Sequence, residues 1–150
     1  MKKIVLFFLL LLACFLANAQ VQNPVKWSYK LKKISNTKYE VHITATIGHG
    51  WHIYSQTTPD GGPVPTAIKF SKNPLIILVG AAKEMGKLEQ LHEELFGVDV
   101  KQFSNTVNFI QTVKIKASVK TAVTGTIEFM VCNDRECLPP STIKFTLPLQ

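Results

Sequence analysis

The chain has 150 residues and a formal net charge of +7, from seventeen lysines and arginines against ten carboxylates. Once a leader is removed, this length suits one domain, which buries roughly two thirds of its unfolded surface and needs no disulfide staple. The basic residues are scattered along the chain, mostly at alternating positions. This indicates solvated sheet faces and argues against a nucleic-acid-binding protein.

The first nineteen residues have the features of an export signal. A positive start, Lys2-Lys3, precedes an apolar run from Ile4 to Leu12, and Ala17-Asn18-Ala19 forms a small-x-small cleavage site. The run is shorter than the about 20 residues that a membrane span needs, and we find no later stretch that could cross a bilayer. We therefore expect residues 1–19 to be a signal peptide and residues 20–150 to be one periplasmic domain with a net charge of +5, because Lys2 and Lys3 are lost.

A lipoprotein is the alternative, because Leu11-Leu12-Ala13-Cys14 resembles a lipobox. Lipidation at Cys14 is the one route by which we expect the protein to be anchored in a membrane. In both cases the protein enters a compartment where disulfides persist.

Apolar and polar residues alternate with period two through most of the remaining chain. The apolar members form five runs: Val25 to Leu31, Tyr39 to Ile47, Val107 to Ile115, Ile127 to Val131 and Ile143 to Leu147. Such runs predict antiparallel strands that are covered on one face. Turn signals separate them at Ser35-Asn36, Gly48 to Gly50, Pro59 to Pro63, Asn73-Pro74 and Ser104-Asn105. Seven or more short strands at this spacing predict an all-β, two-sheet antiparallel sandwich.

The segment from Ala81 to Leu95 fits this pattern least well. It contains Gly86 and lacks a clear apolar stripe. We expect a loop with at most one turn of helix there.

The two cysteines that follow the leader are Cys132 and Cys137, with the polar residues Asn133 to Glu136 between them. An alternating run reaches Val131 and another begins near Thr142, so a hairpin with the cysteines facing each other at its mouth is expected. Paired Cα atoms in an antiparallel ladder lie about 4.5 or 5.5 Å apart. A disulfide tolerates about 4.4–6.8 Å, so the bridge can form. The polar loop predicts that the sulfur atoms lie near the surface.

The residues alone leave the use of this pair open between a structural bridge and a redox switch. A loop this small adds only about 2 kcal/mol as a staple, against more than about 4 kcal/mol for a bridge spanning a hundred residues. Bridges between adjacent strands are prone to strain, and strained or exposed bridges are the reducible ones. Arg135 would favour a thiolate, whereas Asp134 and Glu136 would oppose it.

A metal clamp is a third use of the pair. His49 and His52 would complete a set of two cysteines and two histidines. However, the cysteine spacing is longer than is usual for a clamp, and in a strand the two imidazoles would point to opposite faces. We expect no metal and no other cofactor, and we place His42 and His92 at the surface.

Three segments together resemble a known family. In order and spacing, Gly50-Trp51-His52-Ile53-Tyr54, Glu93-Glu94-Leu95-Phe96-Gly97 and Cys132…Cys137-Leu138-Pro139-Pro140 resemble the amino-terminal periplasmic domain of the thiol:disulfide interchange protein DsbD. The resemblance spans about Val25 to Leu149. It implies an immunoglobulin-like β-sandwich whose cysteine pair passes electrons from a thioredoxin-like donor to exported thiol proteins, as a thiol–disulfide exchange component or protein-disulfide reductase.

The resemblance also implies roles by position. Cys132 and Cys137 match the redox pair, and Cys137 matches the cysteine that forms mixed disulfides with partners. A cap loop that shields the sulfur atoms corresponds to Glu93, Glu94, Leu95 and Phe96, and the positions lining the active site correspond to His52 and Tyr54.

This sequence departs from the family pattern at the cap and around the cysteines. Leu95 stands where an aromatic residue forms the tip of the cap, His52 replaces a tyrosine, and the cysteine spacing is one residue shorter. The full-length family adds a membrane domain and a thioredoxin-like domain, so we expect the donor to be a separate protein. The alternative function is a non-enzymatic immunoglobulin-like binding module with a structural disulfide.

Overall fold

The computed structural model describes residues 23–116 and 120–149, so the expected signal peptide and the lipidation alternative at Cys14 lie outside the described residues. None of the described segments is a helix of the length and apolarity that crossing a bilayer requires. The described strands are β1 (Val25–Lys33), β2 (Lys38–Ile47), β3 (His52–Tyr54), β4 (Ala67–Phe70), β5 (Ile76–Glu93), β6 (Val98–Ile115), β7 (Thr121–Phe129), β8 (Val131–Cys132) and β9 (Ser141–Leu149).

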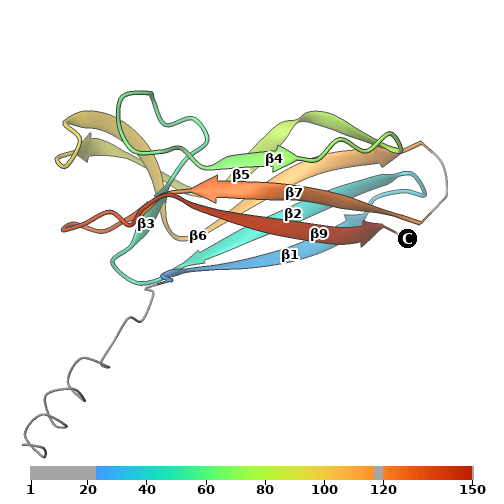
Figure 1. Cartoon of the computed structure of the whole chain (residues 1–150), viewed down its shortest axis with the longest axis horizontal. Coiled ribbons are helices and arrows are strands. Elements are labelled where there is room, and N and C mark those ends of the chain that lie inside the picture. Colours follow the sequence, from blue (N-terminus) through green and yellow to red (C-terminus); the bar gives the residue numbers. More distant parts are fainter. Residues whose placement is uncertain (1–22, 117–119, 150) are drawn as a thin grey trace, which may run out of the picture.

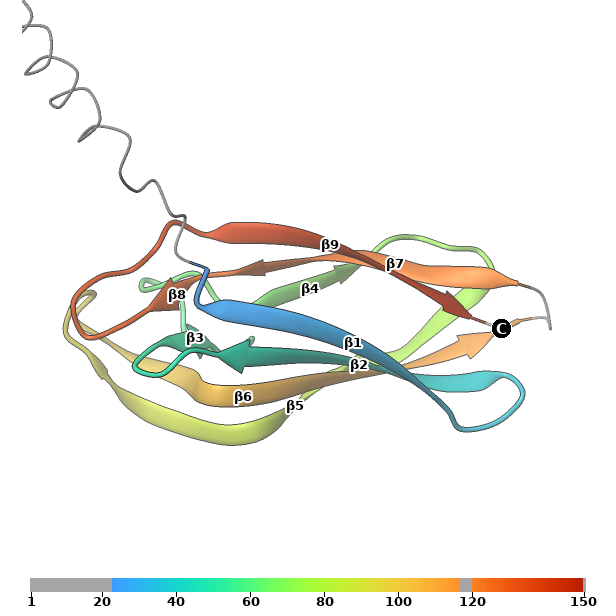
Figure 2. The same cartoon turned by 90° about the horizontal axis from the view of Figure 1, so that it is seen from below.

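The strands form two antiparallel sheets that pack face to face (Figure 1). The larger sheet has the order β1-β2-β6-β3-β8, and β5 pairs with the other side of β6. The smaller sheet has the order β4-β7-β9. Figure 2 shows the strands of both sheets running along the same long axis. The predicted all-β antiparallel sandwich is therefore confirmed.

Alternation along the strands builds the core between the sheets. In β2, Val41, Ile43 and Ala45 are almost fully buried, and the residues between them are more exposed. The Trp27 ring of β1 lies 6.1 Å from the ring of Phe109 and 5.1 Å from that of Phe129, which joins the two sheets. Burial of apolar side chains of this size is the main term that stabilises such a fold.

The segment from Ala81 to Leu95, predicted as a loop, lies mainly in an 18-residue strand, so that prediction was wrong. This strand, β5, lies at the edge of its sheet, and most of its side chains are exposed; its sequence therefore lacks regular alternation. Its register with β6 shifts twice, between Val79 and Lys83 and between Gly86 and Leu88. At the first shift, the buried Gln111 side chain donates hydrogen bonds to the Val79 and Gly80 carbonyls, so the polar backbone there is satisfied.

The predicted turn at Ser104-Asn105 is also wrong, because both residues lie inside β6. Asn105 has a φ of 65°, in the left-handed region that asparagine tolerates better than most residues. On one side of this residue β6 pairs with β3, and on the other it pairs with β2. Asn105 therefore marks where one long strand changes partners, and it allows the short strand β3 to join the sheet.

The run from Ile127 to Val131 does not form one strand. The chain leaves the smaller sheet after Phe129 and enters the larger sheet at Val131, where β8 pairs with β3. This crossing carries Cys132 into the larger sheet, beside β3 and away from its predecessors in β7.

Candidate functional site

The candidate site is built on the outer face of the larger sheet, at the end where β3 and β8 lie. His52 pairs with Cys132 in the β3–β8 ladder, and Ile53 pairs with Val131. Since paired residues share a face and neighbours alternate, Ile53 and Val131 enter the main core, whereas His52, Tyr54 and Cys132 point to the opposite face. Cys132 and Tyr54 pack there with Val100 in a second, smaller buried cluster.

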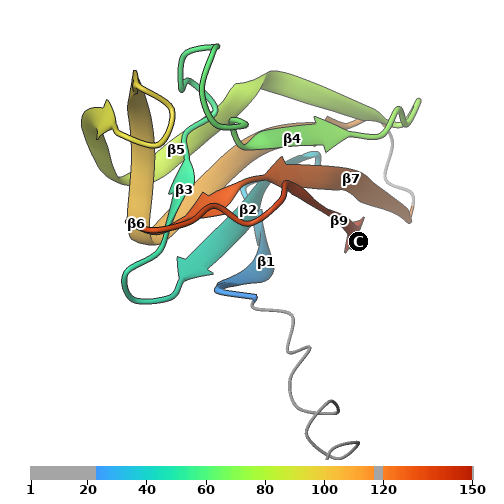
Figure 3. The same cartoon turned by 60° about the vertical axis from the view of Figure 1, so that its left-hand side comes forward.

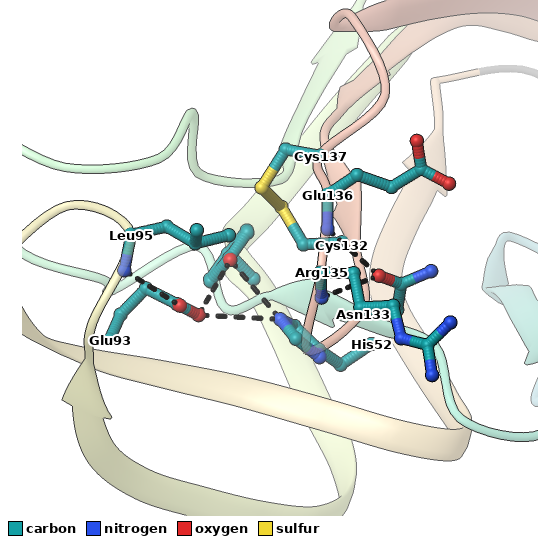
Figure 4. The surroundings of a disulfide bond; sticks show 9 residues. His52, Glu93, Leu95, Cys132, Asn133, Arg135, Glu136 and Cys137 are labelled. Atoms are coloured by element: carbon teal, nitrogen blue, oxygen red, sulfur yellow. Dashed lines mark hydrogen bonds and ion pairs between the residues drawn. A yellow bond between two sulfur atoms is a disulfide. The ribbon is translucent and has the colours of Figure 1, made fainter.

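Cys132 and Cys137 form a disulfide across the mouth of a hairpin, as the spacing predicted. Their Cα atoms are 4.1 Å apart, somewhat closer than the range expected from the sequence. The Asn133 side-chain oxygen accepts hydrogen bonds from the backbone N–H groups of Arg135 (2.8 Å) and Glu136 (2.9 Å) and so shapes the four-residue loop. The hairpin is therefore a tight, locally encoded turn (Figure 4).

The two cysteine residues differ in burial. Cys132 is fully buried, which corrects the expectation that both sulfurs lie near the surface, whereas Cys137 is partly exposed. Cys132 is buried because β8 is an inner arm of the hairpin that pairs with β3. An approaching thiol would therefore meet Cys137 first.

Three polar side chains next to the disulfide form a hydrogen-bond network. The Tyr54 hydroxyl donates to Glu93 Oε2 over 3.1 Å, since a carboxylate can only accept. The Tyr54 oxygen then accepts from Nε2–H of His52, also over 3.1 Å, which assigns the tautomer of a neutral imidazole. His52 Nε2 is also 3.5 Å from Glu93 Oε2. This network links β3 to the end of β5.

Burial sets the protonation behaviour of His52 and Tyr54 in this network. It lowers the pKa of His52 below its ordinary value, although Glu93, Asp134 and Glu89 act in the opposite direction. Burial and the Glu93 carboxylate both raise the pKa of Tyr54. A neutral imidazole and a neutral phenol are therefore the forms expected at neutral pH.

The residues predicted as a cap loop form the turn between β5 and β6. The Phe96 and Gly97 amides both donate to the Glu93 carbonyl, and Gly97 closes the turn with a φ of 66°. Leu95 is 51% exposed and points from the turn toward the disulfide (Figure 4). Phe96 lies instead against Gly62 of the β3–β4 connection, and Glu94 is exposed. Figure 3 shows this end of the β5–β6 hairpin bent toward β3.

The structure thus brings together His52, Tyr54, Glu93 and Leu95 around Cys132 and Cys137. Glu94 and Phe96 belong to the same turn, Glu94 exposed and Phe96 next to Gly62, and His49 lies in an exposed turn before β3. No group of three or more metal-ligating side chains occurs in the part of the chain that the structure describes.

Sequence reasoning missed several members of the site. Val100 is a member of the small buried cluster that contains Cys132, Val98 and Met130 pack against this cluster, and Asn133 shapes the loop between the cysteines. A strand alternation over 98–102 was available as a signal for the two valines. Nothing local marked Met130.

The carboxylates also gather at this end of the molecule. We define the disulfide end as residues 49–66, 83–104 and 130–140. It holds eight carboxylates and four lysines and arginines, a net charge of −4. Negative charge near the cysteines acts against thiolate formation, whereas Arg135 in the loop between them acts in its favour.

Comparisons with known proteins agree with this geometry. The family model described as "Thiol:disulfide interchange protein DsbD, N-terminal" matches residues 19–149. The N-terminal periplasmic domain of ScsB from Proteus mirabilis superposes with a TM-score of 0.60 at 14% identity, covering 88% of this chain and 48% of that one, so the chain spans about half its length. No curated protein sequence matches the chain.

Two further solved structures come from Neisseria meningitidis. The DsbD n-terminal domain in the reduced form gives a TM-score of 0.55 at 16% identity, over 87% of this chain and 93% of that one. The complex between the DsbD N-terminal and PilB N-terminal domains gives a TM-score of 0.51 at 15% identity, and the match covers 87% of this chain and 88% of that one. These likenesses confirm the immunoglobulin-like β-sandwich.

Proposed function

The chain belongs to the family of DsbD N-terminal domains, and from that premise we propose that it is an exported thiol–disulfide interchange domain. In this role, Cys132 and Cys137 cycle between disulfide and dithiol. The observation that carries the proposal is the asymmetry of the pair: Cys132 is buried and Cys137 is partly exposed, beside a turn from which Leu95 points toward the disulfide.

The partly exposed Cys137 is the proposed contact with partners. A thiolate of a thioredoxin-like donor attacks Cys137 Sγ, which forms a mixed disulfide and releases Cys132 as a thiolate that takes up a proton. The second thiolate of the donor then attacks its own partner sulfur and releases Cys137. The donor is oxidised to a disulfide, and this domain gains two electrons and two protons.

The reduced domain then runs the same chemistry toward an exported acceptor. The Cys137 thiolate attacks the disulfide of the acceptor, and Cys132 resolves the mixed disulfide, so the acceptor leaves as a dithiol. Burial of Cys132 supports this division of labour, because the resolving cysteine needs access to Cys137 alone.

The turn from Glu93 to Gly97 is the proposed cap. Its closed position rests on the hydrogen bond from Tyr54 to Glu93, and Leu95 supplies apolar cover near the sulfur atoms. A partner that displaces this turn gains access to Cys137. A small oxidant that does not displace it finds the two thiols covered by the turn. Export to the periplasm completes the proposal, supported by the signal-like residues 1–19 and by the likeness to the ScsB domain, which is a periplasmic one.

Trapping tests the proposal. Cys132→Ser leaves Cys137 free but removes the resolving thiol, so mixed disulfides with partners should accumulate in the cell envelope. The matched variant Cys137→Ser, with Cys132 buried, should trap far less. Recovery of a thioredoxin-like protein on Cys137 supports the carrier. Equal, low trapping by both variants would instead favour a binding module with a structural disulfide.

A further inference from the structure

Charge is separated along the long axis of the molecule. Outside the disulfide end, the described residues carry eleven lysines and two carboxylates, Glu40 and Glu128, a net charge of +9 against −4. These eleven lysines are not all far from the disulfide, since Lys26 and Lys144 lie near the starts of β1 and β9. Many of them lie at the tip opposite the disulfide, where the β1–β2 hairpin, the β4–β5 loop and the end of β6 meet (Figures 1 and 2).

Backbone hydrogen bonds hold these segments together at the tip. The Ile115 amide donates to the Thr37 carbonyl of the β1–β2 hairpin, and the Lys116 amide donates to the Leu75 carbonyl, each over 2.9 Å. The lysines brought together in this way are Lys33, Lys38, Lys72, Lys114 and Lys116; we call them the lysine tip.

Two lysines of the tip repel each other, whereas Lys33 lies over the ring of Tyr39 at 5.9 Å. Lys38 and Lys114 are direct partners in the β2–β6 ladder. Like charges in that position repel, because their Cβ atoms lie about 4.5–5.5 Å apart. Among the residues that the structure describes, none of the ion pairs involves any lysine of the tip; the nearby Glu40 is paired with Lys32 and His42. An anion from outside the chain would relieve this repulsion.

Exposed apolar side chains accompany the lysines. Ile34 at the hairpin tip and Ile77, Leu78 and Val79 at the start of β5 are each 40–46% exposed. Ile77 pairs with Lys114, so apolar and basic side chains share one face. A hollow of about 420 Å³, lined by Phe70, Lys72, Pro74, Ile76 and Leu78 among others, opens beside them.

This combination identifies the kind of partner. A purely polyanionic ligand would match the lysines but leave the isoleucines, leucine and valine unused. The surface of an anionic bilayer offers phosphate groups and acyl chains together, and basic residues near such a surface each contribute attraction while apolar ones insert.

We propose that the lysine tip, with Ile34 and Ile77 to Val79, is a peripheral binding surface for anionic phospholipid membranes. Docking in this way turns the disulfide end away from the bilayer and toward soluble partners. The proposal stands independently of the redox function, because it uses none of the residues of the disulfide site.

Vesicle co-sedimentation tests it with the chain that starts at Gln20. This chain contains both sheets and the whole core, and it lacks the apolar run at Ile4 to Leu12 that could itself insert. We expect binding to phosphatidylcholine vesicles that contain phosphatidylglycerol, loss of binding in high salt, and little binding to phosphatidylcholine alone. The variant Lys38→Gln/Lys114→Gln should bind about thirtyfold more weakly, from about 1 kcal/mol per lysine.

A matched control removes the same charge elsewhere. Lys26→Gln/Lys144→Gln should bind the anionic vesicles nearly as well as the parent chain, since these exposed lysines lie on sheet faces away from the tip. Three outcomes would overturn the proposal: equal losses in both double variants, equal binding to neutral vesicles, or sedimentation without vesicles through contacts between the oppositely charged ends of two copies.

The orientation has its own readout. A tryptophan placed by Ile34→Trp should shift its emission to shorter wavelength when anionic vesicles are added, whereas Leu95→Trp at the other end should not. A shift of the Leu95→Trp signal alone would contradict docking through the lysine tip.

Discussion

The hydrogen bond from Tyr54 to Glu93 is the contact that we expect to keep the cap closed, and Tyr54→Phe removes it with little change in shape. Both partners are buried, and the acceptor is a carboxylate. Hydrogen bonds to charged groups contribute about 1.5–3 kcal/mol. If the bond forms only in the closed position, its loss raises the open population by roughly tenfold to a hundredfold.

Reduction of the disulfide by dithiothreitol measures this population. Because Cys132 is buried and Cys137 only partly exposed, we expect reduction to proceed mainly through the open position and the rate for Tyr54→Phe to rise by a similar factor. Rates follow from alkylation of the released thiols at timed intervals. Urea unfolding of the same samples separates local opening from a general loss of stability.

Tyr29→Phe is the matched control. Tyr29 lies on β1 and stacks on Phe145 at 5.7 Å, away from the disulfide. Its loss should leave the reduction rate unchanged. A wild-type rate in folded Tyr54→Phe, or an equal rise in both variants, would refute the reasoning that this bond closes the cap.

Four further predictions concern the fold and its pH dependence. Burial lowers the pKa of His52, so below about pH 6.5 the unfolded chain binds more protons than the folded one, and stability decreases as the pH is lowered. His52→Gln should reduce this decrease, measured as the urea midpoint at each pH. An unchanged slope in His52→Gln would contradict this. His92→Gln should act above about pH 6.5 instead: the hydrogen bond to Asp99 raises the pKa of His92, so its stabilisation is present at low pH and lost as the pH rises above that value, and the variant should lack this loss. Asn105→Gly should keep full stability by urea unfolding, whereas Asn105→Val should lose about 1–2 kcal/mol, and equal losses would exclude a backbone cause. Gly125→Ala should lose about 1–3 kcal/mol, because its Cβ would lie 2.5 Å from the Lys69 carbonyl oxygen and 2.7 Å from the ring of Phe145. Phe145→Leu in the same chain should restore only the part of the loss that comes from the ring, and no loss in Gly125→Ala itself would contradict both clashes.

Period-two alternation was sufficient to predict the strands of the core, because residues such as Val41 and Ile43 face one shared interior. It failed for β5, where Gly80 and Gly86 lie at register shifts and most side chains face solvent at an edge. It failed at Ser104-Asn105 as well, since a turn residue inside a strand serves there as a bend. Local pattern thus predicts buried strands well and edge or bent strands poorly.

The candidate site was predictable where its chemistry is local. The hairpin placed Cys132 opposite Cys137 from spacing alone, and the bridge is present. The contact from Tyr54 to Glu93 joins residues 39 positions apart, and only the family resemblance had placed both in one site. The burial of Cys132 depends on pairing between β8 and β3, which no local pattern encodes.

The reduction potential of the Cys132–Cys137 couple tests the central claim most directly. The measurement equilibrates the chain from Gln20 with a reduced and oxidised thioredoxin-like protein and quantifies both thiol forms. A carrier should exchange with this partner and have a potential above about −300 mV. A potential below that value, or no exchange with the partner, would make the bridge a structural one and contradict the account.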